Sequence, residues 1–261
     1  MVALSTLALA APAHAAPASK LLGHRCHLYD AAVTNEDTVA ALKDVAAGAP
    51  GAWCEIDAWR ISDGTFIVFH DGTWNRVADA KTLPAGVTRS SKITAATWAQ
   101  VSKIRTKGGQ PIATLQQMID ASAQYHVPLL VEVKNAMSSA SAQSFVSYAK
   151  TKGASVDWYR EPGASCGTSQ LDGLRKAGAR IGIKLSSATA CTPAQLQAKG
   201  VTFITQLQTI ASASYIRSMN NAGVEVYARG ANRNTAKTIL ANGAAKLLCP
   251  DPRVALGWPG S

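Results

Sequence analysis

The segment 128-PLLVEVKNAMSSASAQSFVSYAKTKGASVDWY-159 holds one complete strand–helix–strand unit. Residues 128–134 are a compact apolar run typical of a buried strand, and residues 155–159 form a second strand-like run. Residues 141–152 between them have helical composition, and Gly153 follows them, as a helix C-terminal cap commonly does. This order predicts two parallel strands joined by a crossover helix.

The same alternation continues to the end of the chain. Further helices are predicted at 169–177, 193–199, 213–222 and 233–242, and a glycine follows each of them: Gly178, Gly200, Gly223 and Gly243. Further strands are predicted at 20–25, 52–61, 180–185, 202–206, 224–227 and 245–249. Eight strands separated by helices predict a TIM-type (β/α)8 barrel. A doubly wound open sheet is the alternative, although no glycine-rich nucleotide-binding loop follows any strand.

One excursion interrupts the regular order early in the chain. Strand-like residues 52–61 and 65–70 are joined through Ser62-Asp63-Gly64, and Asp-Gly between such runs predicts a hairpin. Residues 74–109 are polar and contain a short helix at about 95–104, between helices predicted at 35–47 and 114–125. We therefore expect a single domain over residues 20–261, with an insertion at about 74–109 after the second strand and its hairpin.

The composition allows a large core and favours anionic partners. Hydrophobic residues make up 47% of the 261 residues and charged residues 16%, which argues against disorder. The formal charge is +10, from 26 Lys+Arg against 16 Asp+Glu, and excess positive charge attracts phosphodiesters, anionic envelope polymers or lipid headgroups. Because no dense Lys/Arg run is interleaved with aromatic residues, nucleic acid is not an expected partner.

The first residues are typical of a targeting signal. Residues 2–13 are apolar and uncharged, and Ala13-His14-Ala15 has the small-x-small form of a signal-peptidase site. We expect a signal peptide over residues 1–15, cleavage after Ala15 and a secreted mature protein without stable membrane insertion.

Export makes the cysteines candidates for disulfides. There are five, so at least one stays unpaired within the chain. Cys166 and Cys191 lie in polar, turn-like surroundings and are the expected pair. Cys26 could bond to Cys54 or Cys249, and each of these three could equally be a small buried hydrophobic residue.

Carboxylates gather on the early strands. Alternation along a strand places Glu55 and Asp57 on one face, and it does the same for Glu132 and Lys134. If that face lines the barrel, three carboxylates meet at the carboxyl-terminal rim, where active sites of such barrels lie. Their mutual repulsion predicts a bound divalent cation, and oxygen ligands favour Ca²⁺ or Mg²⁺ over zinc.

Histidines and cations accompany these carboxylates. His24 ends the first strand and His70 ends the hairpin strand, so both are expected at the same mouth. Histidine suits the two proton transfers of phosphodiester cleavage at neutral pH. Arg25 and Lys134 would then hold phosphate oxygens. Each residue alone is more often structural, but charged groups at the ends of otherwise apolar strands are costly without a purpose.

These motifs together resemble the glycerophosphodiester phosphodiesterase family, in its secreted bacterial form. The matching runs are His24-Arg25, Asn35-Glu36-Asp37-Thr38, Glu55-Ile56-Asp57, Asp63-Gly64, His70-Asp71, Pro111-Ile112-Ala113-Thr114-Leu115 and Val131-Glu132-Val133-Lys134. The resemblance implies that Glu55, Asp57 and Glu132 bind the metal and that His24 and His70 are the general acid/base pair. It further implies that Arg25 and Lys134 contact phosphate and that the substrate is a small phosphodiester. Separately, we expect the protein to be a monomer.

The chain also departs from the family pattern. Cys26 stands where the family usually has glycine, and Glu36 could act as an acid at a helix start. Tyr227 lies in the strand where the family has tryptophan, so it could offer its ring to the substrate or be a core aromatic residue. Residues 247–252 replace the usual closing strand.

The predicted function is metal-dependent hydrolysis of glycerophosphodiesters to glycerol 3-phosphate and an alcohol, with one Ca²⁺ or Mg²⁺. A phospholipase D-like or sphingomyelinase D-like enzyme on the same barrel is one alternative. A catalytically silent module that binds anionic envelope polymers is another. The residues do not indicate which of the two cations binds or which alcohol is released. They also do not distinguish attack by water from a route through a cyclic phosphate.

Overall fold

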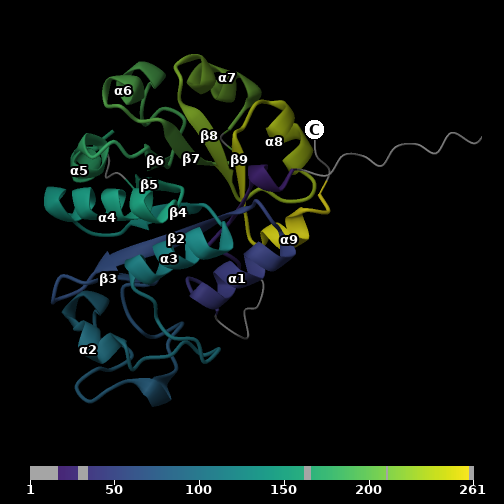
Figure 1. Cartoon of the computed structure of the whole chain (residues 1–261). Helices are drawn as coiled ribbons and strands as arrows, with labels where there is room; N and C mark the ends of the chain where they lie inside the picture. Colours follow the sequence, from purple (N-terminus) through teal and green to yellow (C-terminus); the bar gives the residue numbers. More distant parts are fainter. Residues whose placement is uncertain (1–16, 29–34, 162–165, 210, 259–261) are drawn as a thin grey trace, which may run out of the picture.

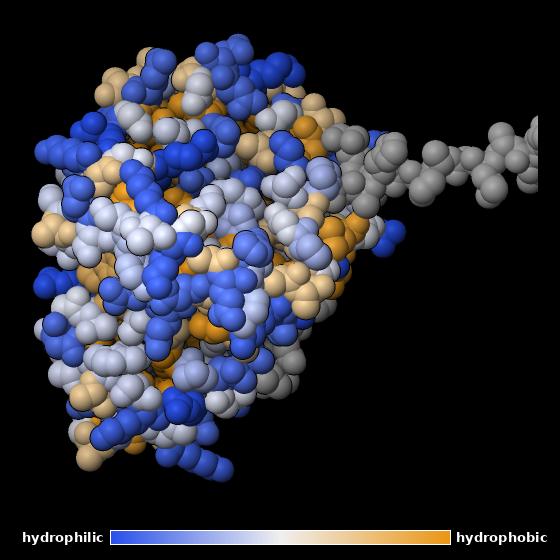
Figure 2. All heavy atoms as spheres, viewed as in Figure 1, coloured by the Kyte–Doolittle hydropathy of each residue, from blue (hydrophilic) through white to orange (hydrophobic). Residues whose placement is uncertain are grey.

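The computed structural model describes residues 17–28, 35–161, 166–209 and 211–258. The predicted signal peptide and its cleavage site after Ala15 lie outside the described residues. In the described part of the chain, no helix combines the length and the apolar character needed to cross a membrane. Figure 2 shows one face covered mostly by polar residues, with hydrophobic residues exposed in small separate areas.

Eight parallel strands close into a barrel. They are β1 (Leu21–Gly23), β2 (Trp53–Arg60), β4 (Leu129–Val133), β5 (Val156–Arg160), β6 (Ile181–Leu185), β7 (Phe203–Leu207), β8 (Glu225–Arg229) and β9 (Lys246–Cys249). Each pairs with the next in the order β1-β9-β8-β7-β6-β5-β4-β2, and β1 also pairs with β2. This last pairing closes the ring, so the predicted TIM-type barrel is confirmed and the open sheet is excluded.

Helices lie outside the strands that they connect (Figure 1). The longer ones are α1 (Val39–Gly48), α3 (Leu115–Tyr125), α4 (Ser139–Lys152) and α7 (Ala213–Asn221). Shorter ones are α5 (Asp172–Lys176), α6 (Pro193–Ala198), α8 (Ala236–Ala241) and α9 (Pro252–Ala255). In α4 the Ser138 hydroxyl caps the first turn, and Gly153 with φ of 71° ends the last, as its left-handed conformation requires.

Large side chains fill the barrel interior. Six buried residues form one cluster there: Leu22, Leu130, Tyr159, Phe203, Tyr227 and Leu248. The rings of Phe203 and Tyr227 stack with centroids 4.6 Å apart. Gly182 on β6 makes room for this stack, because a Cβ atom there would lie 2.1 Å from the Phe203 ring.

The segment between the hairpin and α3 has a hydrophobic cluster of its own. Strand β3 (Phe66–Val68) pairs with β2 in antiparallel fashion, so the predicted hairpin is present. The following segment contains two 3-10 turns and α2 (Trp98–Val101), and it lies beside the barrel next to β3 (Figure 1). Trp74, Ile93 and Ile104 are buried there, against the outer side of the hairpin. This is the inserted segment that the sequence predicted at about 74–109.

The described cysteines divide into one disulfide and three free thiols. Cys166 and Cys191 form a disulfide with Cα atoms 5.7 Å apart, which confirms that prediction. The bond joins the segment after β5 to the segment after β6. Cys26, Cys54 and Cys249 are buried free thiols, so these three act as small hydrophobic residues in the core.

The packing around Gly182 generates a stability prediction. We expect Gly182→Ala to lower the free energy of unfolding by about 1–3 kcal/mol, because the methyl group would collide with the buried Phe203 ring. Gly72→Ala is the matched control, since a Cβ atom there meets nothing within 4 Å. Urea denaturation of both variants measures the difference, and equal stability of the two would contradict this account of the barrel interior.

Candidate active site

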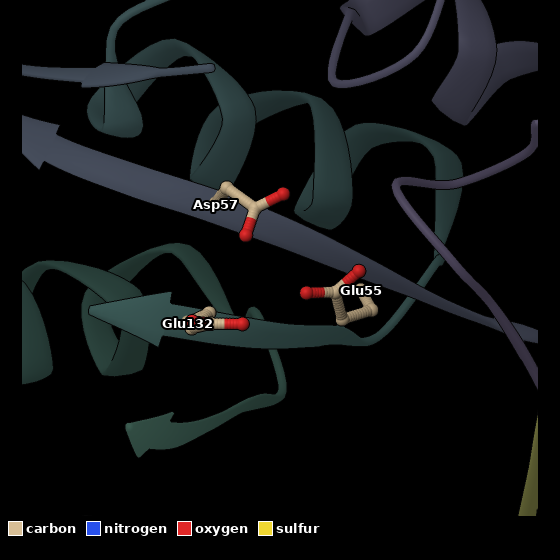
Figure 3. A group of neighbouring side chains, drawn as sticks. All are labelled: Glu55, Asp57 and Glu132. Carbon is tan, nitrogen blue, oxygen red and sulfur yellow. The ribbon is translucent and has the colours of Figure 1, made fainter. Parts of the chain in front are cut away.

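Three carboxylates meet at one end of the barrel interior. Glu55 and Asp57 are two residues apart on β2, and Glu132 on β4 pairs in register with Asp57. Because alternate residues share a face, all three point inward, and Figure 3 shows them turned toward one another. One oxygen from each lies within 4.8 Å of the others, and all three side chains are buried. The sequence prediction that these acids converge is therefore correct.

Two neighbours hold the glutamates in place. The Tyr159 hydroxyl on β5 lies 2.8 Å from Glu55 Oε1 and 2.8 Å from Glu132 Oε2, so it bridges the two carboxylates. The backbone N–H of Arg25 donates to Glu55 Oε2 at 2.9 Å. Sequence reasoning missed Tyr159, although its place near the carboxyl end of a predicted strand was the available signal.

The negative charge is only partly compensated. Lys134 Nζ lies 2.7 Å from Asp57 Oδ1 and 2.9 Å from Glu132 Oε1. Asp57 Oδ2 accepts no hydrogen bond in the described part of the chain, and its 3.9 Å separation from Arg25 Nε is too long for one. Burial and then the neighbouring Glu55 raise the pKa of Asp57. A buried carboxylate oxygen without a donor, beside two more carboxylates, fits a divalent cation with oxygen ligands.

His24 lies beside the carboxylates, where the sequence predicted it. Its Nε2 is 4.0 Å from Glu55 Oε2, and its side chain is 37% exposed. Partial burial, followed by the positive charge of Arg25, lowers the pKa of His24 to about 4. The ring is therefore neutral at neutral pH and able to accept a proton.

His70 is oriented by the residue that follows it. Its Nδ1 lies 2.7 Å from Asp71 Oδ1, and Trp59 Nε1 donates to its backbone carbonyl. A carboxylate at Nδ1 favours the tautomer with hydrogen there, which leaves Nε2 free to exchange a proton. Burial lowers the pKa of His70, whereas Asp57 and Asp71 act in the opposite direction.

An ion network connects the inserted segment to the site. Arg76 donates to both Asp71 oxygens and, through Nη1 and Nη2, to both Glu36 oxygens. Glu36 in turn accepts from Arg25 Nη1 at 3.0 Å. Sequence reasoning missed Arg76, because a single arginine in a polar segment carries no motif. The suggestion that Glu36 acts at a helix start is wrong, since Thr38 caps α1 and Glu36 pairs with the two arginines.

The chain takes an uncommon path between β1 and α1. Arg25 and Cys26 have φ values of 54° and 64°, in the left-handed region that glycine favours. This path directs the Arg25 N–H toward Glu55 and lets Cys26 N–H donate to the Glu55 carbonyl. It also explains why a glycine would suit position 26. In this chain the buried Cys26 occupies the position, and its left-handed backbone conformation costs about 1–2 kcal/mol.

Tyr227 lies elsewhere. Its side chain is 1% exposed in the barrel interior, where its hydroxyl donates to Asp157 at 3.0 Å and its ring stacks on Phe203. Asp157 precedes Tyr159 by two residues on β5, so the hydroxyl points toward the amino end of the strands and away from the carboxylates. The expectation that its ring is offered to a substrate is wrong, because alternation on β8 directs this side chain into the core.

Comparison with known families found one matching family model. Residues 24–246 match the family model described as the glycerophosphoryl diester phosphodiesterase family. No curated protein sequence matches the chain.

Several solved structures share the fold. A glycerophosphodiester phosphodiesterase from Parabacteroides distasonis has a TM-score of 0.71 at 14% identity, over 92% of this chain and 96% of that one. A glycerophosphodiester phosphodiesterase from Agrobacterium tumefaciens has a TM-score of 0.71 at 16% identity, over 91% of this chain and 99% of that one. A phosphodiesterase from Oleispira antarctica was solved in complex with the product sn-glycerol-3-phosphate. It has a TM-score of 0.72 at 17% identity, over 90% of this chain and 94% of that one.

The carboxylate cluster generates a binding prediction. We expect Glu55→Gln to weaken Ca²⁺ or Mg²⁺ binding by about tenfold or more, because it removes a negative ligand and keeps the acceptor for Tyr159. Isothermal titration of the metal-stripped protein measures the change. Asp120→Asn, which removes an exposed carboxylate paired with Lys152, is the control and should bind as tightly as the parent. Unchanged affinity in Glu55→Gln would refute the cluster as the cation site.

The Asp71–His70 contact generates a titration prediction. We expect Asp71→Asn to lower the pKa of His70, because the charged acceptor at Nδ1 stabilises the imidazolium. NMR titration of the His70 ring protons in the metal-free protein measures the shift. Asp172→Asn, remote on α5, should leave the titration unchanged. A pKa that rises or stays constant in Asp71→Asn would show that the contact does not support the ring.

Proposed function

Because the chain belongs to the glycerophosphoryl diester phosphodiesterase family, we propose that it hydrolyses glycerophosphodiesters to glycerol 3-phosphate and an alcohol. The observation that carries the proposal is the convergence of Glu55, Asp57 and Glu132, with two histidines belonging to the same end of the barrel. A fold of this type supports many activities, so the argument depends on these groups and not on the barrel alone.

The three carboxylates would hold one divalent cation, Ca²⁺ or Mg²⁺. Such an ion would act as a Lewis acid and neutralise negative charge on the phosphate oxygens. The chain itself adds positive groups. Lys134 lies between Asp57 and Glu132, and Arg25 lies 3.9 Å from Asp57, so both would contact phosphate oxygens beside the carboxylates. Glu36 fixes the direction of the Arg25 guanidinium from the far side.

His24 and His70 would share the two proton transfers. One removes the proton from the attacking hydroxyl, and the other protonates the leaving alkoxide. His24 is neutral at neutral pH and would act as the base, whereas Asp71 at Nδ1 of His70 stabilises the imidazolium form, which would act as the acid. The attacking group is either water or the free hydroxyl next to the phosphate on the substrate. The second route forms a cyclic phosphate that water then opens, with the two histidines exchanging roles.

The alternatives have less support. A lipid-cleaving enzyme would need an apolar loop to meet the lipid surface, and in the described residues the exposed large hydrophobic side chains are Leu207 and Val254 alone. A silent binding module would not need the complete set of acids, histidines and cations. The Cys166–Cys191 disulfide supports the proposal that the protein is secreted, since such bonds persist in oxidising compartments. We further propose that it acts as a monomer.

Release of glycerol 3-phosphate from glycerophosphodiesters tests the proposal. The mature protein should be active with Ca²⁺ or Mg²⁺ and inactive in EDTA, and added metal should restore activity. His24→Ala and His70→Ala should each lower kcat by about 10²–10⁴-fold, because each removes a proton-transfer group. His126→Asn, at the exposed end of α3, is the control and should retain full activity. Normal rates in both alanine variants would refute the acid/base pair, and inactivity with every metal would refute the function.

A further inference from the structure

A pocket opens beside His24, next to the carboxylates. Its volume is about 230 Å³, and it is lined by residues at the carboxyl ends of β7, β8 and β9 together with the residues that follow them. Leu207, Leu248 and Pro250 form apolar walls, and Arg229 is the charged residue among the lining groups. The pocket is therefore larger than a glycerol molecule and combines apolar walls with one cation.

His24 belongs to both the pocket and the site. It lines the pocket and lies 4.0 Å from Glu55, and its backbone N–H donates to the Cys249 carbonyl on the pocket wall. Arg229 is close enough for its positive charge to act on the His24 ring. A diester whose phosphate lies over the carboxylates would thus extend one substituent past His24 into this pocket.

Two features of the lining side chains point to an occupant. Arg229 Nε is buried and has no hydrogen-bond acceptor in the described part of the chain. Leu207 is 41% exposed, whereas most leucines in the described part of the chain are buried. A donor without an acceptor and an exposed apolar side chain in the same pocket both favour an occupant that brings oxygen atoms and carbon.

The lining also lacks what a cationic headgroup needs. Quaternary ammonium groups are recognised by the faces of Trp, Tyr or Phe rings and by carboxylates. Among the described lining residues there is no such ring and no carboxylate, whereas Arg229 repels positive charge. An alcohol with hydroxyl groups could accept a hydrogen bond from Arg229 and pack its carbon chain on Leu207 and Leu248.

We propose that this pocket receives the alcohol substituent of the diester, and that Arg229 makes the protein selective for polyol substituents without positive charge. This inference rests on the proposed function and extends it to the identity of the alcohol. Glycerophosphoglycerol is the model substrate of the favoured class, and glycerophosphocholine is the cationic counterpart with the same glycerol 3-phosphate part.

Comparison of kcat/KM for these two diesters tests the selectivity. The parent protein should prefer glycerophosphoglycerol by about tenfold or more, which corresponds to about 1.4 kcal/mol. Arg229→Gln should bring the ratio close to one, and Arg229→Glu should favour glycerophosphocholine. Arg229→Lys keeps the charge and should keep the preference, which separates a charge effect from misfolding. Arg217→Gln, on the exposed face of α7, is the matched control and should behave like the parent.

Equilibrium binding separates this inference from the function. Both diesters are titrated calorimetrically into His70→Ala, which retains the pocket, and into the same variant with Arg229→Gln. Tighter binding of glycerophosphoglycerol that disappears in the second variant supports the inference, whether or not the parent hydrolyses either diester. Equal affinities in His70→Ala would overturn it. An Arg229→Gln change that weakens both diesters by the same factor would also overturn it, because Arg229 would then contact only their shared part.

Discussion

Burial of three carboxylates within 4.8 Å of one another is the constraint around which the rest of the site is organised. Two of them are forced together by register, because Asp57 and Glu132 are paired positions on adjacent parallel strands. Such an arrangement is unfavourable in a protein interior unless donors and positive charge surround it. Each unusual feature nearby can be understood as a response to that cost.

The responses come from different parts of the chain. Tyr159, on β5, bridges Glu55 and Glu132, and Lys134, directly after β4, contacts Asp57 and Glu132. Arg25 and Cys26, after β1, have strained left-handed backbone conformations, and this path lets the Arg25 N–H donate to Glu55. Asp57 Oδ2 remains without a donor in the described residues, which is where a cation has most to offer. Burial and then the positive charge of Arg25 lower the pKa of His24, whereas the nearby Glu36 and Glu132 raise it.

Most of the barrel and its carboxylates could be predicted from sequence, because both follow from local rules. Period-two alternation put Glu55 and Asp57 on one face, and the carboxyl-end rule placed Glu132 beside them. Arg76 could not be predicted, because its contacts depend on the path of a loop. The position of Tyr159 near the end of a predicted strand was a usable signal, but its contacts with both glutamates depend on how the strands pair. The role of Tyr227 was misjudged, because a family position specifies the strand but not how deeply the side chain is buried in the barrel.

The inserted segment packs on the hairpin, outside the main core, but it also contributes to the chemistry of the site. Trp74 and Ile93 belong to a hydrophobic cluster separate from the main core, and this cluster includes Ile67 of the hairpin. Arg76 makes the contribution to the site, since it joins Asp71 to Glu36 across it. If the segment is remodelled without a positively charged side chain at position 76, Asp71 and Glu36 both lose a partner. The support that these two residues give to His70 and Arg25 is then weakened together. Exchange of this segment is therefore constrained by the chemistry of the site as well as by packing.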